Sequence, residues 1–133
     1  MSDNRVYSYS AVLMGSPIQL KLCSHNEALA SHVFQLIKRY EDLLTVNRAE
    51  SQVMDINHAA GRHPVTVSRP VFQLIQCAKA ASMVRDSAFN LAIGPLVKLW
   101  RIGFQGHSVP DAGEIRARLA LTLPQEVLLD EAT

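Results

Sequence analysis

The chain has 133 residues, enough for one ordinary domain, and its 48% hydrophobic and 19% charged residues are typical of a protein that folds around a core. Its 13 basic and 12 acidic residues give a formal charge of +1, so no strong field favours nucleic acid or an anionic membrane as a partner. The two cysteines have no metal-binding spacing, and no apolar run is long enough to span a membrane. We therefore expect a single cytoplasmic domain over residues 1–133, with two buried, reduced thiols.

Two predicted strands open the chain. Residues 6–14 mix aromatic, β-branched and small polar side chains, a composition that favours a strand. Residues 18–22 alternate apolar with polar side chains, which is the period of a strand with one buried face. Because Gly15 and Pro17 mark a turn between the two segments, we expect an antiparallel hairpin.

A long helix should follow and cover this hairpin. Apolar residues recur three and four positions apart, which predicts a helix over about residues 26–44. The residues of this apolar stripe are Leu29, Val33, Leu36, Ile37, Tyr40 and Leu44.

Further helices begin at recognisable signals. Ser51, Ser68 and Asp111 are residue types that cap helix N-termini, and a Gly-Pro pair begins another short helix. Between the last two helices, residues 103–110 are glycine-rich, which predicts an irregular exposed segment. The expected helices cover about residues 51–61, 68–84, 94–100 and 111–121.

The last predicted element is a strand over residues 126–130, whose sequence is Glu-Val-Leu-Leu-Asp. Two strands, several helices and a final strand indicate an α+β fold in which antiparallel strands pack against helices. A strand in this position needs a partner strand, because its backbone groups are otherwise unpaired.

Three segments combine special backbone residues with polar groups. Gly15 serves either a tight turn or the close approach of a ligand. Asn47 lies either in an exposed polar turn or in a binding loop between two helices. Asn90 either caps the following turn or hydrogen-bonds a ligand. The segments are residues 14–17, 45–51 and 88–100.

Catalytic and metal-binding patterns are missing from the sequence. The five histidines show no HxxxH or HExxH spacing, so no metal ligand is assigned. Neither a nucleophile elbow nor a phosphate-binding GxxxxGK[ST] loop is present, so the catalytic residues stay unassigned.

Taken in order, however, five motifs resemble the opening motifs of the FAD:protein FMN transferases, the ApbE-like family. The resemblance runs over about residues 9–130, and its last motif is the most specific. The motifs are Met14-Gly-Ser-Pro, Leu44-Thr-Val-Asn-Arg-Ala-Glu-Ser, Ile56-Asn-His-Ala-Ala-Gly, His63-Pro-Val-Thr-Val-Ser and Ile93-Gly-Pro-Leu-Val-Lys-Leu-Trp.

The resemblance implies a reaction. Members of this family cleave FAD with magnesium, release AMP and attach FMN through a phosphoester to a threonine or serine of a target flavoprotein. Some relatives instead hydrolyse FAD to FMN and AMP. The implied partners are thus FAD and an acceptor flavoprotein, with Mg²⁺ as the metal.

The resemblance also implies binding residues for FAD. Met14 should lie against the flavin nucleotide, and Asn47 takes the position where many members have a tyrosine. Ala88, Phe89 and Asn90 match an FAD-contacting segment, in which Asn90 replaces a frequent acidic residue.

The family's later segments, a DLGGIAKGY-like stretch and a distal Asp/Thr pair that bind magnesium and the FAD phosphates, have no counterpart in this sequence. The chain is therefore expected to be the amino-terminal part of the flavin transferase fold and to be inactive by itself. Alternatives are an FAD hydrolase, a non-catalytic FAD- or nucleotide-binding module, or an interaction protein that self-associates through an open strand edge.

Overall fold

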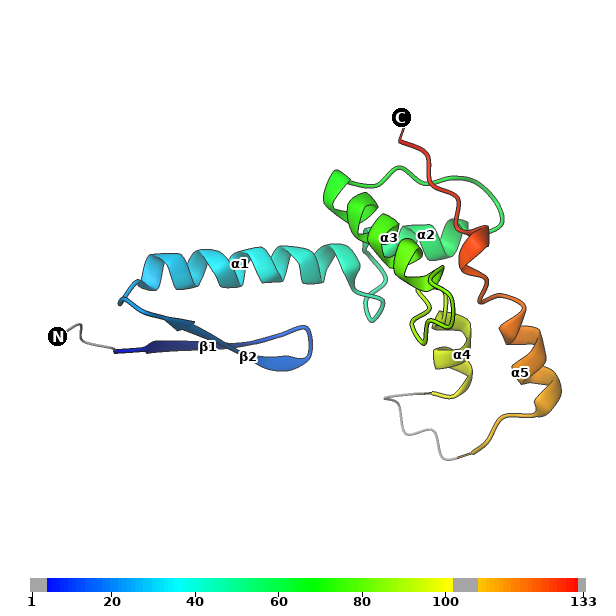
Figure 1. The fold of residues 1–133 in the computed structure, drawn as a ribbon, viewed down its shortest axis with the longest axis horizontal. Coiled ribbons are helices and arrows are strands. Elements are labelled where there is room, and N and C mark those ends of the chain that lie inside the picture. Colours follow the sequence, from blue (N-terminus) through cyan, green and yellow to red (C-terminus); the bar gives the residue numbers. More distant parts are fainter. Residues whose placement is uncertain (1–4, 102–107, 132–133) are drawn as a thin grey trace. The chain divides into compact units, whose positions relative to one another are not determined.

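The computed structural model describes residues 5–101 and 108–131, and Figure 1 shows the order of their helices and strands. The contacts divide the chain into two compact units, residues 1–67 and residues 68–133. The expectation of a single domain over residues 1–133 stays a prediction.

The first unit begins with the expected hairpin. Strands β1 (Tyr7–Leu13) and β2 (Ser16–Leu22) are antiparallel, with Tyr7 opposite Leu22 and Leu13 opposite Ser16. Met14 and Gly15 form the two-residue turn, with φ angles of 53° and 71°. Positive φ at both central residues is the signature of a type I′ turn, whose twist matches that of the strands. The hairpin is thus confirmed with Gly15 in its turn, whereas Pro17, the second residue expected in the turn, lies within β2.

Helix α1 (Glu27–Leu44) packs against β1. It begins at Asn26, whose side chain accepts a hydrogen bond from the Leu29 amide at 2.9 Å. Tyr9 of β1 fixes this start, because its hydroxyl accepts the Asn26 amide hydrogen at 2.8 Å. The side of α1 that meets the hairpin includes Ala30, which is only 2% exposed, and Phe34.

The predicted apolar stripe of α1 is partly wrong. Leu29 and Leu36 are 44% and 45% exposed, although the sequence pattern placed them on the buried face. The face of α1 that meets β1 is instead a neighbouring one, which carries Ala30 and Phe34. A search for large apolar residues gives this face too little weight, because alanine is small.

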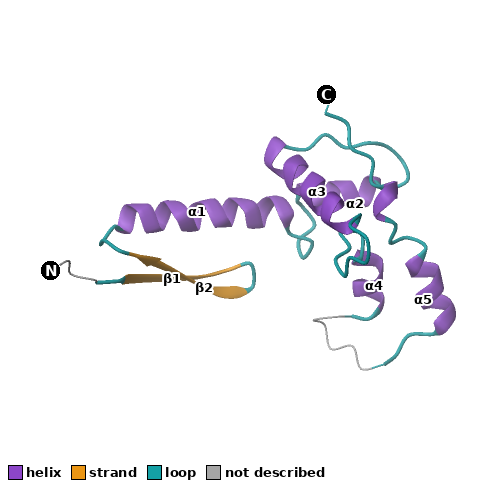
Figure 2. Cartoon of the chain, viewed as in Figure 1, coloured by secondary structure: helices purple, strands orange, loops and turns teal. Residues whose placement is uncertain are grey.

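Helix α2 (Gln52–Ala59) completes the first unit and contacts α1 (Figure 2). Ser51 is its N-cap, since its hydroxyl accepts the Met54 amide hydrogen at 3.0 Å. Gly61 follows the helix with a φ of 73°, the left-handed conformation expected after a helix end. Ala59, the last residue of α2, is 4% exposed.

The second unit is helical. Helix α4 (Gly94–Leu99) packs against α5 (Ala112–Leu119), and the 3₁₀ turn η1 (Pro124–Glu126) packs against α3 (Arg69–Ser82). The side chain of Asp111 caps α5 through the Gly113 amide at 2.7 Å. Ser68 is the N-cap residue of α3, but its side chain makes no capping bond. Among the unit's residues that the structure describes, the most buried are Val71, at 0% exposed, and Thr122, at 6%.

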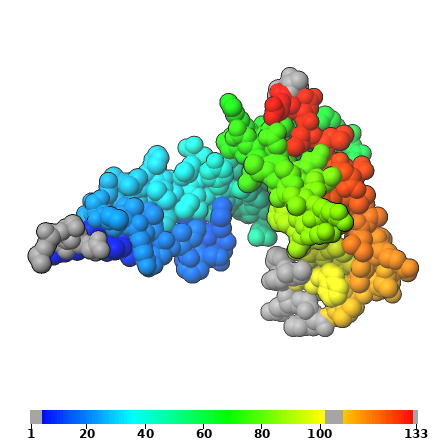
Figure 3. All heavy atoms as spheres, viewed as in Figure 1, coloured from blue at the N-terminus to red at the C-terminus, as the bar shows by residue number. Residues whose placement is uncertain are grey.

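The strand predicted over residues 126–130 is wrong. Only a 3₁₀ turn forms there, and the residues after it have no regular structure. Two side chains of α3 hold this segment instead: Lys79 Nζ donates to the Val127 carbonyl at 2.7 Å, and Gln76 Nε2 donates to Glu131 Oε1 at 3.2 Å. Figure 3 shows the red segment beside the green atoms of α3. In the described part of the chain no strand lies beside this segment to pair with it.

The α+β class is confirmed by two antiparallel strands and several helices. Cys23 and Cys77 are free thiols, but both are exposed rather than buried. Within residues 5–101 and 108–131, no helix is both long enough and apolar enough to cross a membrane. Of the irregular segment expected over residues 103–110, residues 103–107 lie outside the described residues.

We predict that Gly15→Ala destabilises the chain by about 1 kcal/mol, because a backbone conformation with positive φ is unfavourable for alanine. A Cβ at Gly15 would meet no atom within 4 Å, so the expected loss comes from the backbone alone. Gly94→Ala is the matched control: its site is equally open and has no positive φ, so its stability should change by less than about 0.5 kcal/mol. Urea unfolding followed by circular dichroism measures both. Equal effects would contradict the assignment of the turn.

Candidate functional site

Met14 occupies the first position of the hairpin turn. Its φ of 53° is uncommon for a residue other than glycine, and such outliers gather at functional sites. The Met14 amide donates to Glu41 Oε1 at 3.2 Å, which ties the turn to the last turns of α1. The Met14 side chain remains 49% exposed. The backbone is therefore held while the thioether is presented to solvent.

The carboxylate that holds Met14 belongs to a charged cluster on α1. Lys38 Nζ lies 3.5 Å from Glu41 Oε2 and 2.5 Å from Asp42 Oδ1. Arg48, in the loop after the helix, also binds Asp42 Oδ1, at 2.6 Å. The hydrogen bonds from Lys38 and Arg48 lower the pKa of the Asp42 carboxyl, and the bond to Asp42 raises the pKa of Lys38.

Glu41 and Asp42 therefore hold two of the predicted binding segments from adjacent positions. Glu41 binds the turn that carries Met14, and Asp42 binds the loop that carries Asn47. The sequence reasoning missed both carboxylates. The only signal for them was the spacing of three and four residues from Lys38, which is common on solvated helix faces.

Asn47 lies in the loop between α1 and α2, and the loop is anchored by Thr45. The Thr45 hydroxyl accepts the Asn47 amide hydrogen at 3.2 Å, and the Thr45 carbonyl accepts from Ser51 Oγ at 2.6 Å. Ser51 in turn caps α2. The side chain of Asn47 is exposed. Two helices thus fix the Asn47 backbone and leave its amide group accessible.

Ala88, Phe89 and Asn90 lie in the second unit, in the loop between α3 and α4. Ser87 Oγ lies 3.2 Å from the Phe89 amide nitrogen and 3.3 Å from its carbonyl oxygen, so the loop turns locally around this hydroxyl. Ala88 is exposed, and Phe89 is 52% exposed. Phe89 is therefore not the core residue that an aromatic side chain of this kind suggests, and its ring is available to a ligand.

Asn90 holds this loop in place with both ends of its amide. Its Oδ1 accepts the Ala92 amide hydrogen at 2.8 Å, and its Nδ2 donates to the carbonyl of the buried Thr122 at 2.9 Å. The interpretation of Asn90 as a cap is thus confirmed. Its contact with a ligand stays a prediction. An NH₂ group carries two donors, and Thr122 takes one of them.

The described residues do not fit a magnesium site. Within residues 5–101 and 108–131, no group of three or more His, Cys, Asp or Glu side chains is placed to hold a metal ion. Octahedral magnesium takes oxygen ligands in near-ideal positions. The carboxylates of Glu41 and Asp42 are already bound to Lys38, Arg48 and the Met14 amide.

The family model described as the ApbE family matches residues 14–133. The chain is 92% identical to an FAD:protein FMN transferase of Klebsiella pneumoniae strain 342 over all 133 residues, which are 42% of that protein. It is 33% identical over 120 residues to an FAD:protein FMN transferase of Treponema pallidum strain Nichols, covering 86% of this chain and 33% of that protein. The chain thus spans less than half the length of these relatives.

Solved structures give the same likeness. The flavinyl transferase ApbE of Pseudomonas stutzeri, in its apo form, matches with a TM-score of 0.83 and 27% identity, covering 95% of this chain and 42% of that one. The ApbE protein of Thermotoga maritima matches with a TM-score of 0.82 and 26% identity, covering 96% and 42%. These matches confirm the expected fold as a partial portion of a larger one.

We predict that Asn90→Ala destabilises the chain by about 1–3 kcal/mol, because it removes two hydrogen bonds and leaves the Thr122 carbonyl without this donor. The exposed Gln73 of α3 provides the control: Gln73→Ala should change the stability by less than about 0.5 kcal/mol. Both values come from urea unfolding. An Asn90→Ala variant with unchanged stability would show that the loop does not depend on this amide.

Proposed function

Because this chain belongs to the ApbE family, we propose that it supplies the amino-terminal part of an FAD:protein FMN transferase. One observation carries the proposal: 92% identity, over the whole chain, to a protein with that name. Since the chain spans 42% of that relative, the activity is proposed for the complete protein rather than for these residues alone.

The proposed reaction moves FMN from FAD to a hydroxyl of another protein. The threonine or serine oxygen of the acceptor flavoprotein forms a bond to the FMN phosphorus. The bond between that phosphorus and the bridging pyrophosphate oxygen breaks, and AMP leaves with this oxygen. The hydroxyl proton is released. FAD and the acceptor flavoprotein are thus the proposed partners.

We assign FAD contacts to the five residues identified from the sequence, which are Met14, Asn47, Ala88, Phe89 and Asn90. Support for the first two is local: each has a fixed backbone and an exposed side chain. The half-exposed ring of Phe89 suits stacking on a flat nucleotide base or flavin ring. The second N–H of the Asn90 amide suits a polar edge of the ligand.

The proposal also includes magnesium, which neutralises charge on a transferring phosphoryl group. The described residues do not fit this ion, so no step is assigned through it and its ligands are expected in the remaining part of the fold. This is the physical reason to expect that the chain alone does not turn over. The expected cytoplasmic location stays a prediction.

We predict that the isolated chain binds FAD at least about tenfold more weakly than the full-length Klebsiella relative, with or without magnesium, and releases no AMP. Isothermal titration measures the binding, and chromatography detects AMP and FMN. Magnesium-dependent AMP release by the chain alone would contradict its proposed incompleteness. Weak binding without turnover agrees with the proposal, whereas tight binding without turnover would favour the non-catalytic binding module.

The Met14 contact has its own control. At millimolar FAD, the saturation transferred from the chain to FAD is measured by NMR. This transfer should be lost with the Met14→Ala variant and kept with the Met83→Ala variant. Met83 is an equally exposed methionine, at 53%, outside the proposed contacts. Equal signals in the two variants would remove Met14 from the binding residues.

A further inference from the structure

The backbone of Met14 needs support from outside the hairpin. In a hairpin with a two-residue turn, the ladder hydrogen bonds end at the flanking pair, here Leu13 and Ser16, so the ladder does not use the Met14 amide. Asparagine, aspartate and glycine are the usual residues at this place in a type I′ turn. A φ of 53° is unfavourable for methionine, because its Cβ crowds the backbone in the left-handed conformation.

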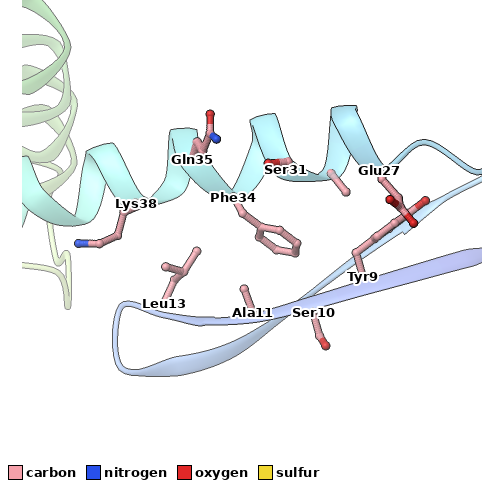
Figure 4. Close-up of a pocket in the computed structure, with 10 residues that line it drawn as sticks. Tyr9, Ser10, Ala11, Leu13, Glu27, Ser31, Phe34, Gln35 and Lys38 are labelled. Carbon is pink, nitrogen blue, oxygen red and sulfur yellow. The ribbon is translucent and has the colours of Figure 1, made fainter.

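The Glu41 carboxylate gives this support. Its Oε1 accepts the Met14 amide hydrogen at 3.2 Å, and the Glu41 side chain is only 25% exposed. Its other oxygen, Oε2, lies 3.5 Å from Lys38 Nζ. Figure 4 shows Lys38 on α1 near Leu13, the residue before the turn. The carboxylate is thus held at both oxygens.

Glu41 also stands where the loop that carries Asn47 begins. Its carbonyl accepts the Thr45 amide hydrogen at 3.0 Å, and the Thr45 hydroxyl accepts the Asn47 amide hydrogen at 3.2 Å. The backbone of Glu41 therefore leads into this loop, while its side chain reaches the Met14 turn. One residue at the end of α1 sets where the two proposed FAD contacts lie relative to each other.

We propose that Glu41 is a positioning residue for the flavin nucleotide. Its carboxylate holds the Met14 turn so that the Met14 side chain meets the ligand beside the Asn47 loop, and it acts through Met14 without touching FAD. Binding groups need such hydrogen-bonded support, because a small displacement of the group costs much of its effect. The nearby Lys38 ammonium offsets the negative charge, which would otherwise repel an anionic nucleotide. The inference rests on the proposed function.

The test uses a full-length protein in which this chain replaces the matched residues of the Klebsiella relative. The two sequences are 92% identical there, so the replacement is conservative. FAD binding is measured by isothermal titration with magnesium present. Glu41→Ala should raise the Kd for FAD at least about fivefold, because the Met14 amide loses a charged acceptor.

Conservative variants separate positioning from a general need for a glutamate. Glu41→Gln keeps an oxygen that can accept the Met14 amide hydrogen, so its Kd should lie within about twofold of the wild type. Glu41→Asp keeps the charge but is one methylene too short to reach the turn, so its Kd should rise at least about threefold. Glu27→Ala is the matched control: it removes a carboxylate from the other end of α1 and should change the Kd by less than about twofold.

A double variant tests whether Glu41 acts through Met14. In a Met14→Ala background no thioether remains to be positioned, so adding Glu41→Ala should change the Kd by no more than about twofold. A further fivefold loss would show that Glu41 reaches the ligand by another route, and would overturn the proposal. If Glu41→Ala fails to fold by circular dichroism, the comparison of Glu41→Gln with Glu41→Asp decides, and equal affinities in those two variants would overturn it.

A measurement without ligand separates this inference from the proposed function. In the same protein without FAD, hydrogen exchange of the Met14 amide should become at least about threefold faster with Glu41→Ala, and unchanged exchange would overturn the proposal. A wild-type protein that binds FAD equally well with Glu41→Ala would overturn the positioning role alone. A wild-type protein that binds no FAD would contradict the proposed function, and the positioning role with it.

Discussion

Two neighbouring carboxylates at the end of α1 connect the parts of the first unit. Glu41 accepts a hydrogen bond from the Met14 amide in the hairpin turn, and Asp42 accepts one from the Arg48 side chain in the following loop. Lys38 bonds to Asp42 and lies close to Glu41, which offsets the repulsion between adjacent negative charges. The turn and the loop that carry the proposed flavin contacts therefore depend on the same helix end for their positions.

Burial sets a second constraint. Among residues 5–101 and 108–131, the buried apolar residues are Ala30, Ala59 and Val71, all of them small or medium in size. Burial of apolar surface is the main favourable contribution to folding, so few residues here contribute it in full. This sparse burial agrees with a chain that spans 42% of its Klebsiella relative, so that most of that relative's residues lie outside it.

Local signals predicted most of the elements, and long-range contacts decided the rest. Ser51 and Asp111 cap their helices through residues two or three positions away, as their residue types predicted, whereas the side chain of Ser68 makes no capping bond. The strand expected over residues 126–130 was wrong because a short apolar run by itself supplies no partner strand, and Lys79 holds that segment instead. The Glu41 bond to Met14 spans 27 positions, so no spacing rule indicated it. The five proposed FAD contacts were identified through motif resemblance and remain predictions.

The most direct test of the account is cleavage of FAD by the two parts together. This chain, the carboxy-terminal part of the Klebsiella relative, and their co-expressed pair are each incubated with FAD and magnesium, and AMP is measured by chromatography. The account predicts AMP from the pair and none above background from either part alone. AMP release by this chain alone, at the rate of the pair, would contradict the claim that these residues are one part of a larger transferase.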